Sequence, residues 1–151
     1  MLREKLNDAL KQAMRDKETL RVSTLRLVMA AIKDRDIALR ADGQDNSADD
    51  TEITTILIKM VKQRKDSATQ YSDAGRKDLA DKEHAEIAVI GMFLPKQLSD
   101  EQTQKAIETL IKELNVESIR DMGKIMGTLK ERYSGQMDFA KAGALVKKIL
   151  G

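Results

Sequence analysis

The sequence predicts an all-α protein, and the spacing of its apolar residues leads to that expectation. Apolar residues recur three or four positions apart through nearly all of the 151 residues, which is the spacing of one face of a helix. No segment shows the two-residue alternation of a half-buried strand. Hydrophobic residues make up 41% of the chain and charged residues 34%, a balance typical of a folded helical chain rather than a disordered one. We therefore predict seven helices and no sheet.

The first two predicted helices occupy the N-terminal 40 residues. A single apolar stripe predicts a helix that begins at residue 2, ends near residues 16–18 and turns one face inward. The second helix, over residues 19–40, is apolar on two faces, one through Leu27 and the other through Val28. A helix that is apolar around so much of its circumference is expected to be the one that its neighbours pack around.

An acidic stretch separates the second helix from the third. Residues 42–50 contain Gly, Asn, Ser and four Asp, a composition that predicts a loop. Asp49 and Glu52 have the spacing of a capping box, in which each side chain accepts a hydrogen bond from the other residue's backbone N–H. The third helix should begin there and end at Gly75, which can adopt the left-handed conformation that closes helices. A fourth helix is predicted over residues 78–92.

The single proline, Pro95, marks the predicted domain boundary. Proline has no backbone N–H and its ring clashes with the preceding turn, so the fourth helix cannot continue through it. We predict a four-helix domain over residues 1–95 and a small three-helix domain over residues 96–151.

The second predicted domain begins with another capping signal. Ser99 and Gln102 form a capping box ahead of the fifth helix, with two acids in its first turn. A stripe that begins at Ile119 predicts the sixth helix over residues 119–133, and a last helix, capped by Asp138, follows a short turn.

The composition excludes several classes of function. Without Cys the chain has no disulfide, thiol nucleophile or thiolate metal site, and the cytoplasm is the expected compartment. His84 is the single imidazole and lies in a charged helical stretch, so we interpret it as a half-exposed helix residue rather than a general base. No apolar run approaches the roughly 20 residues of a membrane helix. We expect no catalytic residues, no metal, no cofactor and no membrane association.

Two glycines interrupt the predicted sixth helix, and each costs about 1 kcal/mol relative to Ala. At 100° per residue, Gly123, Gly127 and Lys130 fall on one strip that faces away from the core. Arg120 and Lys124 lie beside this strip. Either another helix of this protein docks there, or the strip faces a ligand. Basic side chains beside bare backbone favour a phosphate ligand.

Charge is unevenly distributed in the second predicted domain. Residues 99–119 contain two basic and five acidic residues, whereas residues 120–151 contain seven basic and three acidic residues. A basic pair of helices can follow a nucleic-acid backbone largely without sequence preference. Aromatic residues are only 3% of the chain, which favours shape or phosphate recognition of a folded RNA over base stacking. The predicted RNA-binding residues are Arg120, Gly123, Lys124, Gly127, Lys130, Arg132 and Lys141.

A second set of basic residues lies in the first predicted domain. Arg26, Lys33 and Arg40 recur at seven-residue spacing on the second helix. Interspersed acids such as Asp34 and Asp36 favour a solvated face, so we rank this set second. The secondary basic face comprises Arg26, Lys33, Arg64, Lys65 and Arg76.

An ordered set of motifs resembles the GatB/YqeY family, and specifically its stand-alone YqeY-like members. These motifs lie at residues 20–26 (LRVSTLR), 63–67 (QRKDS), 75–80 (GRKDLA), 83 and 86 (Glu in both), 94–99 (LPKQLS) and 121–127 (DMGKIMG). The resemblance covers essentially the whole chain.

The resemblance implies both an architecture and a set of partners. Similar proteins have a helical N-terminal domain followed by a small helical domain like the tail of the B subunit of the tRNA-dependent amidotransferase. In that enzyme the tail touches tRNA while the chemistry occurs elsewhere. The implied partners are tRNA or another structured RNA, and amidotransferase or aminoacyl-tRNA synthetase subunits.

Three functions remain open from the sequence. We predict an accessory RNA-binding protein without catalysis of its own, because the chain lacks room for the amidotransferase's catalytic cradle. The first alternative is a protein–protein scaffold that receives a partner helix on the face of Gly123 and Gly127. The second is the activity that the family label implies, a carbon–nitrogen ligase with glutamine as amido-N donor.

Overall fold

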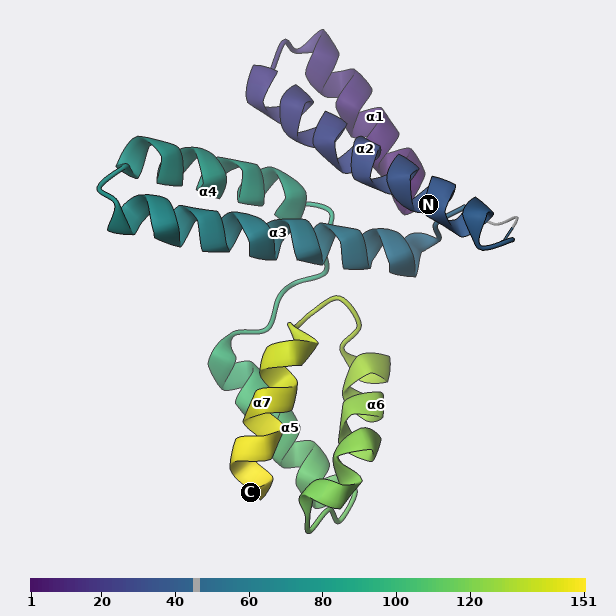
Figure 1. Ribbon diagram of the computed structural model, residues 1–151, viewed down its shortest axis with the longest axis vertical. Coiled ribbons are helices and arrows are strands. Elements are labelled where there is room, and N and C mark those ends of the chain that lie inside the picture. The colour runs from purple at the N-terminus through teal and green to yellow at the C-terminus, as the bar shows by residue number, and fades with distance from the viewer. Residues whose placement is uncertain (45–46) are drawn as a thin grey trace. The chain divides into compact units, whose positions relative to one another are not determined.

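The computed structural model describes residues 1–44 and 47–151, and this part of the chain is helical (Figure 1). It contains seven α-helices and one short 3₁₀ helix, and no strand occurs in the described residues. The all-α prediction is therefore confirmed. The predicted loop over residues 42–50 includes residues 45 and 46, which lie outside the described residues. The chain divides into two compact units, Met1–Leu94 and Pro95–Gly151. That each unit is a separate folding domain stays a prediction.

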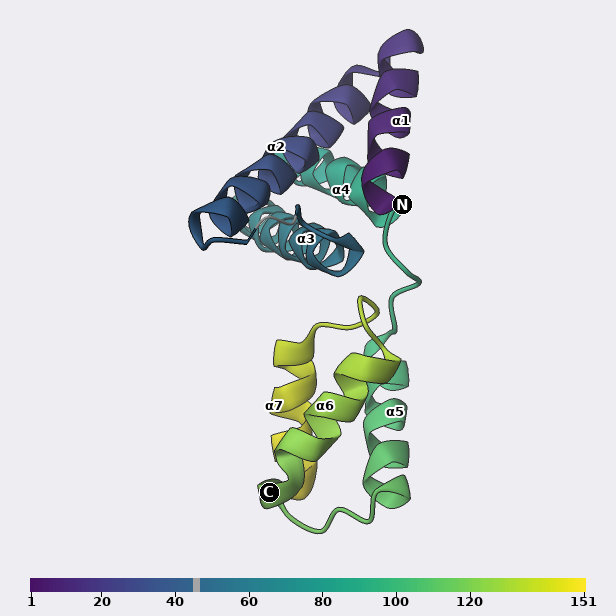
Figure 2. The same cartoon turned by 90° about the vertical axis from the view of Figure 1, so that its right-hand side faces the viewer.

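The first unit consists of two pairs of helices. Helices α1 (Leu2–Arg15) and α2 (Thr19–Ala41) pack together, and α3 (Asp50–Asp73) and α4 (Lys77–Gly91) run side by side along their length (Figures 1 and 2). Their shared core is formed by fully buried aliphatic side chains. The largest of these are Leu6, Leu25, Ile32, Ile53, Leu57 and Ile90.

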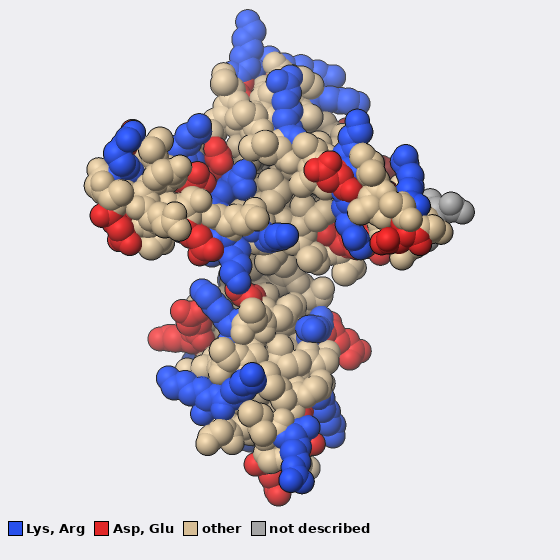
Figure 3. Space-filling model, in the orientation of Figure 1, with Lys and Arg blue, Asp and Glu red and all other residues tan. Residues whose placement is uncertain are grey.

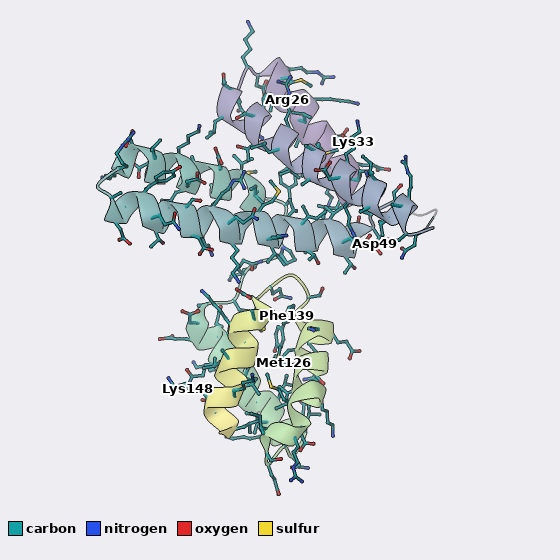
Figure 4. The ribbon with its side chains drawn as sticks, in the orientation of Figure 1. Arg26, Lys33, Asp49, Met126, Phe139 and Lys148 are labelled. Carbon is teal, nitrogen blue, oxygen red and sulfur yellow. The ribbon has the colours of Figure 1, made fainter. Side chains whose placement is uncertain are left out.

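The predicted signals at both ends of α3 are confirmed. Asp49 (labelled in Figure 4) accepts a hydrogen bond from the Glu52 backbone N–H at 2.8 Å, and the Glu52 carboxylate accepts the reciprocal bond. Such a cap stabilises a helix by about 1 kcal/mol. Gly75 has φ +73°, and the N–H groups of Gly75 and Arg76 return to carbonyls of the last turn. These local contacts fix the length of α3.

Asp36 is buried within the first unit, which corrects its assignment to a solvated face. Its carboxylate accepts two hydrogen bonds from the Arg3 guanidinium, both at 3.0 Å, and one from the Ala48 backbone N–H at 2.7 Å. The hydrogen bonds from Arg3 and then from Ala48 hold the pKa of Asp36 below its ordinary value of 3.8. Asp36 therefore ties α1 and the segment before α3 to α2.

We expect Asp36→Ala to lower the free energy of unfolding by about 2 kcal/mol at pH 7, because the substitution leaves the buried Ala48 N–H without an acceptor. A carboxyl whose pKa is lower in the folded state stabilises that state above its unfolded pKa and loses this effect as the pH falls. The difference between wild type and variant should therefore shrink below pH 3.8. Urea denaturation at pH 7 and pH 3 measures both effects. The control is Asp34→Ala, an exposed acid of the same helix, and equal losses in the two variants would contradict the prediction.

The second unit contains three α-helices and the 3₁₀ helix. Its elements are α5 (Asp100–Glu113), η1 (Ile119–Asp121), α6 (Met122–Arg132) and α7 (Phe139–Leu150). The predicted capping box of α5 is confirmed, because Ser99 and Gln102 exchange hydrogen bonds of 3.1 and 3.0 Å. Fully buried Ile107, Leu110, Ile125, Leu129 and Val146 form the centre of the core.

The start of the sixth helix differs from the prediction. Residues 119–121 form η1 rather than the first turn of α6, and Ile119 is 47% exposed instead of facing the core. A 3₁₀ turn has three residues per turn, so it rotates Ile119 away from the apolar stripe that α6 continues. The core-facing stripe therefore begins at Met122.

Candidate nucleic-acid interface

Five of the seven predicted RNA-binding residues lie together on one exposed face of η1 and α6. This face is opposite Ile125 and Leu129, whose side chains are fully buried in the core of the second unit. Because residues three and four apart share a helix face, the buried pair directs the remaining positions toward solvent. The exposed members are Arg120, Gly123, Lys124, Gly127 and Lys130. We call this set the α6 face.

The two glycines of the α6 face are bare. A Cβ atom built at Gly123 or Gly127 would meet no atom of the described second unit within 4 Å, outside the backbone of its own helix. No other helix of that unit therefore packs on the strip, which removes close packing within the unit as the reason for these glycines. The backbone of α6 is open to an incoming group along two successive turns.

The cations of the α6 face are available for a ligand. No carboxylate of the described residues lies within 4.0 Å of Arg120, Lys124 or Lys130 in an ion pair. Glu131, one turn after Gly127, is exposed on the same side of the helix. Three cations thus surround one acid, and the face keeps a positive local charge.

Arg132 lies away from the α6 face, contrary to the prediction. Its guanidinium donates two hydrogen bonds, both at 2.8 Å, to the two carboxylate oxygens of Glu113 on α5. Hydrogen bonding to Arg132 lowers the pKa of Glu113, and the same contact raises the pKa of Arg132. The pair bridges α5 and α6, so Arg132 serves their association.

Lys141 also lies apart from the α6 face. It lines a shallow hollow of about 480 Å³ between the start of α5 and α7, together with Lys148 (labelled in Figure 4). Asp100 and Glu101 line the same hollow and offset the two lysines. Figure 3 accordingly shows acidic and basic side chains intermixed on this side of the second unit rather than a continuous basic surface.

Arg64, predicted for the secondary basic face, is nearly buried in the contact between α3 and α4. Its Nε donates to Glu86 Oε2 at 2.9 Å, and its Nη1 donates to the Met60 carbonyl at 3.2 Å. The Arg64 and Glu86 side chains are 13% and 12% exposed. This ion pair corrects the placement of Arg64 on an exposed surface.

The other members of the secondary basic face are spread over three helices. Arg76 pairs with Asp78 at 3.3 Å at the start of α4, and Lys65 is exposed on α3. Arg26 and Lys33 are exposed on α2, where Figure 4 labels them. The predicted set is therefore not one surface.

Two structural features of the second unit are not predicted by the sequence. Gln97 Nε2 donates to the Gly135 carbonyl at 2.6 Å, and the Leu98 N–H donates to the Gln136 carbonyl at 2.8 Å, so the segment after Pro95 holds the turn between α6 and α7. The second feature is Gly143, a buried glycine of α7 that faces α6. The Ser-Gly composition indicates the turn itself. No periodicity relates the turn to Gln97, which is 38 positions from Gly135.

The described residues contain no group of three or more His, Cys, Asp or Glu residues that could hold a metal ion. His84 is exposed on α4. None of the helices in the described chain has the length and apolar character needed to span a bilayer.

Comparison with known proteins identifies a family and several relatives. The family described as "Yqey-like protein" matches residues 3–150. The protein named "Altered inheritance of mitochondria protein 41, mitochondrial" is 37% identical over 89 residues in Vanderwaltozyma polyspora, which is 59% of this chain and 46% of that protein. In Kluyveromyces lactis the same-named protein is 32% identical over 70% of this chain and 56% of the relative. In Saccharomyces cerevisiae the same-named protein is 29% identical over 82% of this chain and 68% of the relative. The chain thus spans about half the length of the first two relatives.

Proposed function

Because the chain belongs to the YqeY-like protein family, we propose that it is an accessory protein that binds tRNA or another folded RNA through the α6 face. The single observation that carries this proposal is the combination of bare helix backbone with three cations that lack an ion-pair partner among the described residues. Phosphate oxygens accept hydrogen bonds from Lys and Arg and can approach a helix closely where side chains are absent.

The chemistry of the α6 face fits contact with phosphates better than reading of bases. Lys124 and Lys130 project from α6 six residues apart, which is about 9 Å along the helix axis. Their long side chains can therefore engage phosphates of one stretch of backbone. The face contains no aromatic residue on which a base could stack. We therefore infer recognition of backbone shape, with little dependence on sequence.

Replacing Gly123 and Gly127 by Ala should change the stability of the second unit and its affinity for tRNA in opposite directions. We expect the double variant to stabilise the second unit by about 1–2 kcal/mol, because Ala favours helix over Gly and both added methyl groups enter open space. We also expect it to bind tRNA at least about fivefold more weakly, since the methyl groups hold phosphate away from the backbone. Thermal denaturation and filter binding measure the two effects.

The matched control is Gly91→Ala at the end of α4, where a Cβ also meets no atom within 4 Å. This variant should leave tRNA binding unchanged. A double Ala variant that is more stable and binds tRNA as tightly as wild type would show that the bare backbone is not part of the binding surface.

Association with tRNA-dependent amidotransferase chemistry is part of the proposal and rests on the resemblance of the second unit to that enzyme's B-subunit tail. Amidotransferase or aminoacyl-tRNA synthetase subunits are the corresponding proposed partners. We propose that any amide transfer occurs on those partners. Glutamate released from glutamine by this chain alone, with ATP and mischarged tRNA present, would instead support the carbon–nitrogen ligase alternative.

The scaffold alternative uses the same face with a different occupant. Two bare glycines one turn apart also allow a partner helix to approach α6 closely. A protein helix would not require the three cations, so binding of amidotransferase subunits that survives Lys124→Ala and Lys130→Ala would favour the scaffold over RNA.

The compartment is likewise a proposal. The absence of Cys is the feature that supports the cytoplasm. The relatives carry mitochondrial names, which makes a mitochondrial location the alternative, and fractionation of the source cells distinguishes the two.

A further inference from the structure

Helix α2 has an apolar face that no other helix of its unit covers. Leu25, Val28 and Ile32 are fully buried in the core, as predicted for one face. On the other predicted apolar face Ala31 packs against the core but Leu27 is 51% exposed, and Ile37 further along α2 is 54% exposed. Helices α1, α3 and α4 pack around α2, as predicted, and leave the side that carries Leu27 and Ile37 open.

The exposed residues on this side follow the spacing of a helix-packing seam. They recur at alternating intervals of four and three positions, the pattern through which two helices interlock side chains. Three of the six are Ser or Ala, which leave room for large side chains of an opposing helix. The seam consists of Ser23, Leu27, Ala30, Asp34, Ile37 and Ala41, all exposed. It extends for about 27 Å along α2.

One flank of this α2 seam is uniformly basic. Arg26, Lys33 and Arg40 each directly precede a seam residue, all three are exposed, and none forms an ion pair with a carboxylate of the described chain. Figure 3 shows basic side chains spread over the first unit, with both uncharged and acidic side chains between them. Residues that flank a seam in this way set the choice of partner by charge.

The other flank, which includes Ala31 and Ala38, is uncharged. Two antiparallel copies of α2 would place basic flanks against each other, and two parallel copies would place them against alanines. A second copy of this chain therefore leaves the cations of both flanks uncompensated, whereas a helix with acidic residues on the facing flank neutralises them.

A hollow lies at the N-terminal end of the seam. It has a volume of about 310 Å³, and its lining residues are Met14, Lys17, Thr19, Val22, Ser23 and Arg26. Such a site accepts an apolar side chain whose neighbours are acidic, and it extends the contact surface from α2 onto the end of α1.

We propose that the α2 seam docks an amphipathic helix of another protein, one that places large apolar residues on the seam and Asp or Glu opposite Arg26, Lys33 and Arg40. RNA is the less suitable occupant, because phosphates gain nothing from covering Leu27 and Ile37 and are repelled by Asp34 in the middle of the seam. This surface is on the first unit and is separate from the α6 face.

A designed peptide tests the proposal on the full chain. The probe is a labelled helical peptide of about three heptads, with Leu at seam positions, Glu at flank positions and one central Arg to face Asp34. A control peptide has Lys in place of every Glu. Fluorescence anisotropy should show that the Glu peptide binds at least about tenfold more tightly than the Lys peptide.

Variants of the chain identify the surface. Leu27→Ser with Ile37→Ser should weaken Glu-peptide binding at least about tenfold, and Arg26→Glu with Lys33→Glu and Arg40→Glu should reverse the preference between peptides. Met92→Ser and Lys82→Glu, which change an exposed apolar and an exposed basic residue of the same unit, should do neither. Circular dichroism verifies that each variant is folded.

Two outcomes would overturn the proposal. The first is binding of both peptides with equal affinity, or binding that neither set of α2 substitutions alters. The second is loss of tRNA binding in the triple charge variant while Leu27→Ser with Ile37→Ser affects no ligand, which would make the basic flank an RNA surface.

Discussion

Replacing Glu86 by Ala is expected to lower the free energy of unfolding of the first unit by about 3 kcal/mol. The Glu86 carboxylate accepts a 2.9 Å hydrogen bond from Arg64, and both side chains are nearly buried between α3 and α4. Removing one partner of a buried ion pair leaves a desolvated charge without compensation, which is far more costly than losing an exposed pair. Arg64 would retain only its bond to the Met60 carbonyl.

Chemical denaturation measures this effect, and two further variants define its cause. Asp78→Ala removes the exposed partner of Arg76 and should leave stability nearly unchanged. Arg64→Leu combined with Glu86→Leu should recover most of the loss, because a buried ion pair can be replaced by packed apolar side chains. Similar small effects of Glu86→Ala and Asp78→Ala would contradict a structural role for the buried pair.

Replacing Gly143 by Leu is expected to destabilise the second unit by about 2–3 kcal/mol. A Cβ at Gly143 would already lie 3.3 Å from Met122 Cε and 3.8 Å from Met126 Cε. A leucine side chain would have to push α6 away from α7, and overpacking of a core costs energy of this size. Met126 and Phe139, labelled in Figure 4, lie in this contact between the two helices.

Hydrogen exchange of the α6 and α7 amides reports the stability of the second unit directly. Gly143→Leu should accelerate exchange there, whereas Gly127→Ala should slow it, because Gly127 faces open space. The two glycines thus have opposite predicted responses. Unchanged exchange in Gly143→Leu would show that α6 and α7 do not depend on close approach at this position.

The features that the sequence predicts well are those that depend on neighbouring residues. The capping boxes of Asp49 and Ser99 involve partners three positions away, and Gly75 closes α3 through its own backbone conformation. The exposed α6 face was also predictable, because the positions on one helix determine which of them lie opposite Ile125 and Leu129.

The features that the sequence could not predict depend on how one helix lies against another. Arg132 points to Glu113, 19 positions away, and Arg64 to Glu86, 22 positions away. A count of charges along the sequence treats Arg132 and Arg64 as cations without a partner. Only the packing of α5 with α6, and of α3 with α4, brings each arginine to its carboxylate.

The exposed side of α2 has the same explanation. The sequence does not show whether a helix of the same unit or a partner protein covers its apolar residues. Helices α1, α3 and α4 all pack on α2, yet they leave Leu27 and Ile37 exposed. Likewise, the hydrogen bonds of Gln97 and Leu98 to the α6–α7 turn arise from an irregular segment that has no periodic signal.

The salt dependence of tRNA binding tests the central proposal most directly. Binding that uses phosphate contacts weakens linearly in a plot of log affinity against log salt concentration, with a slope of about one for each contact. Lys124→Ala with Lys130→Ala should weaken binding at low salt and reduce the slope by about two. The control is Lys105→Ala with Lys112→Ala, which removes two exposed lysines of α5 and should preserve the wild-type slope. Undetectable wild-type binding at low salt, or a slope that Lys124→Ala with Lys130→Ala leaves unchanged, would contradict RNA recognition by the α6 face.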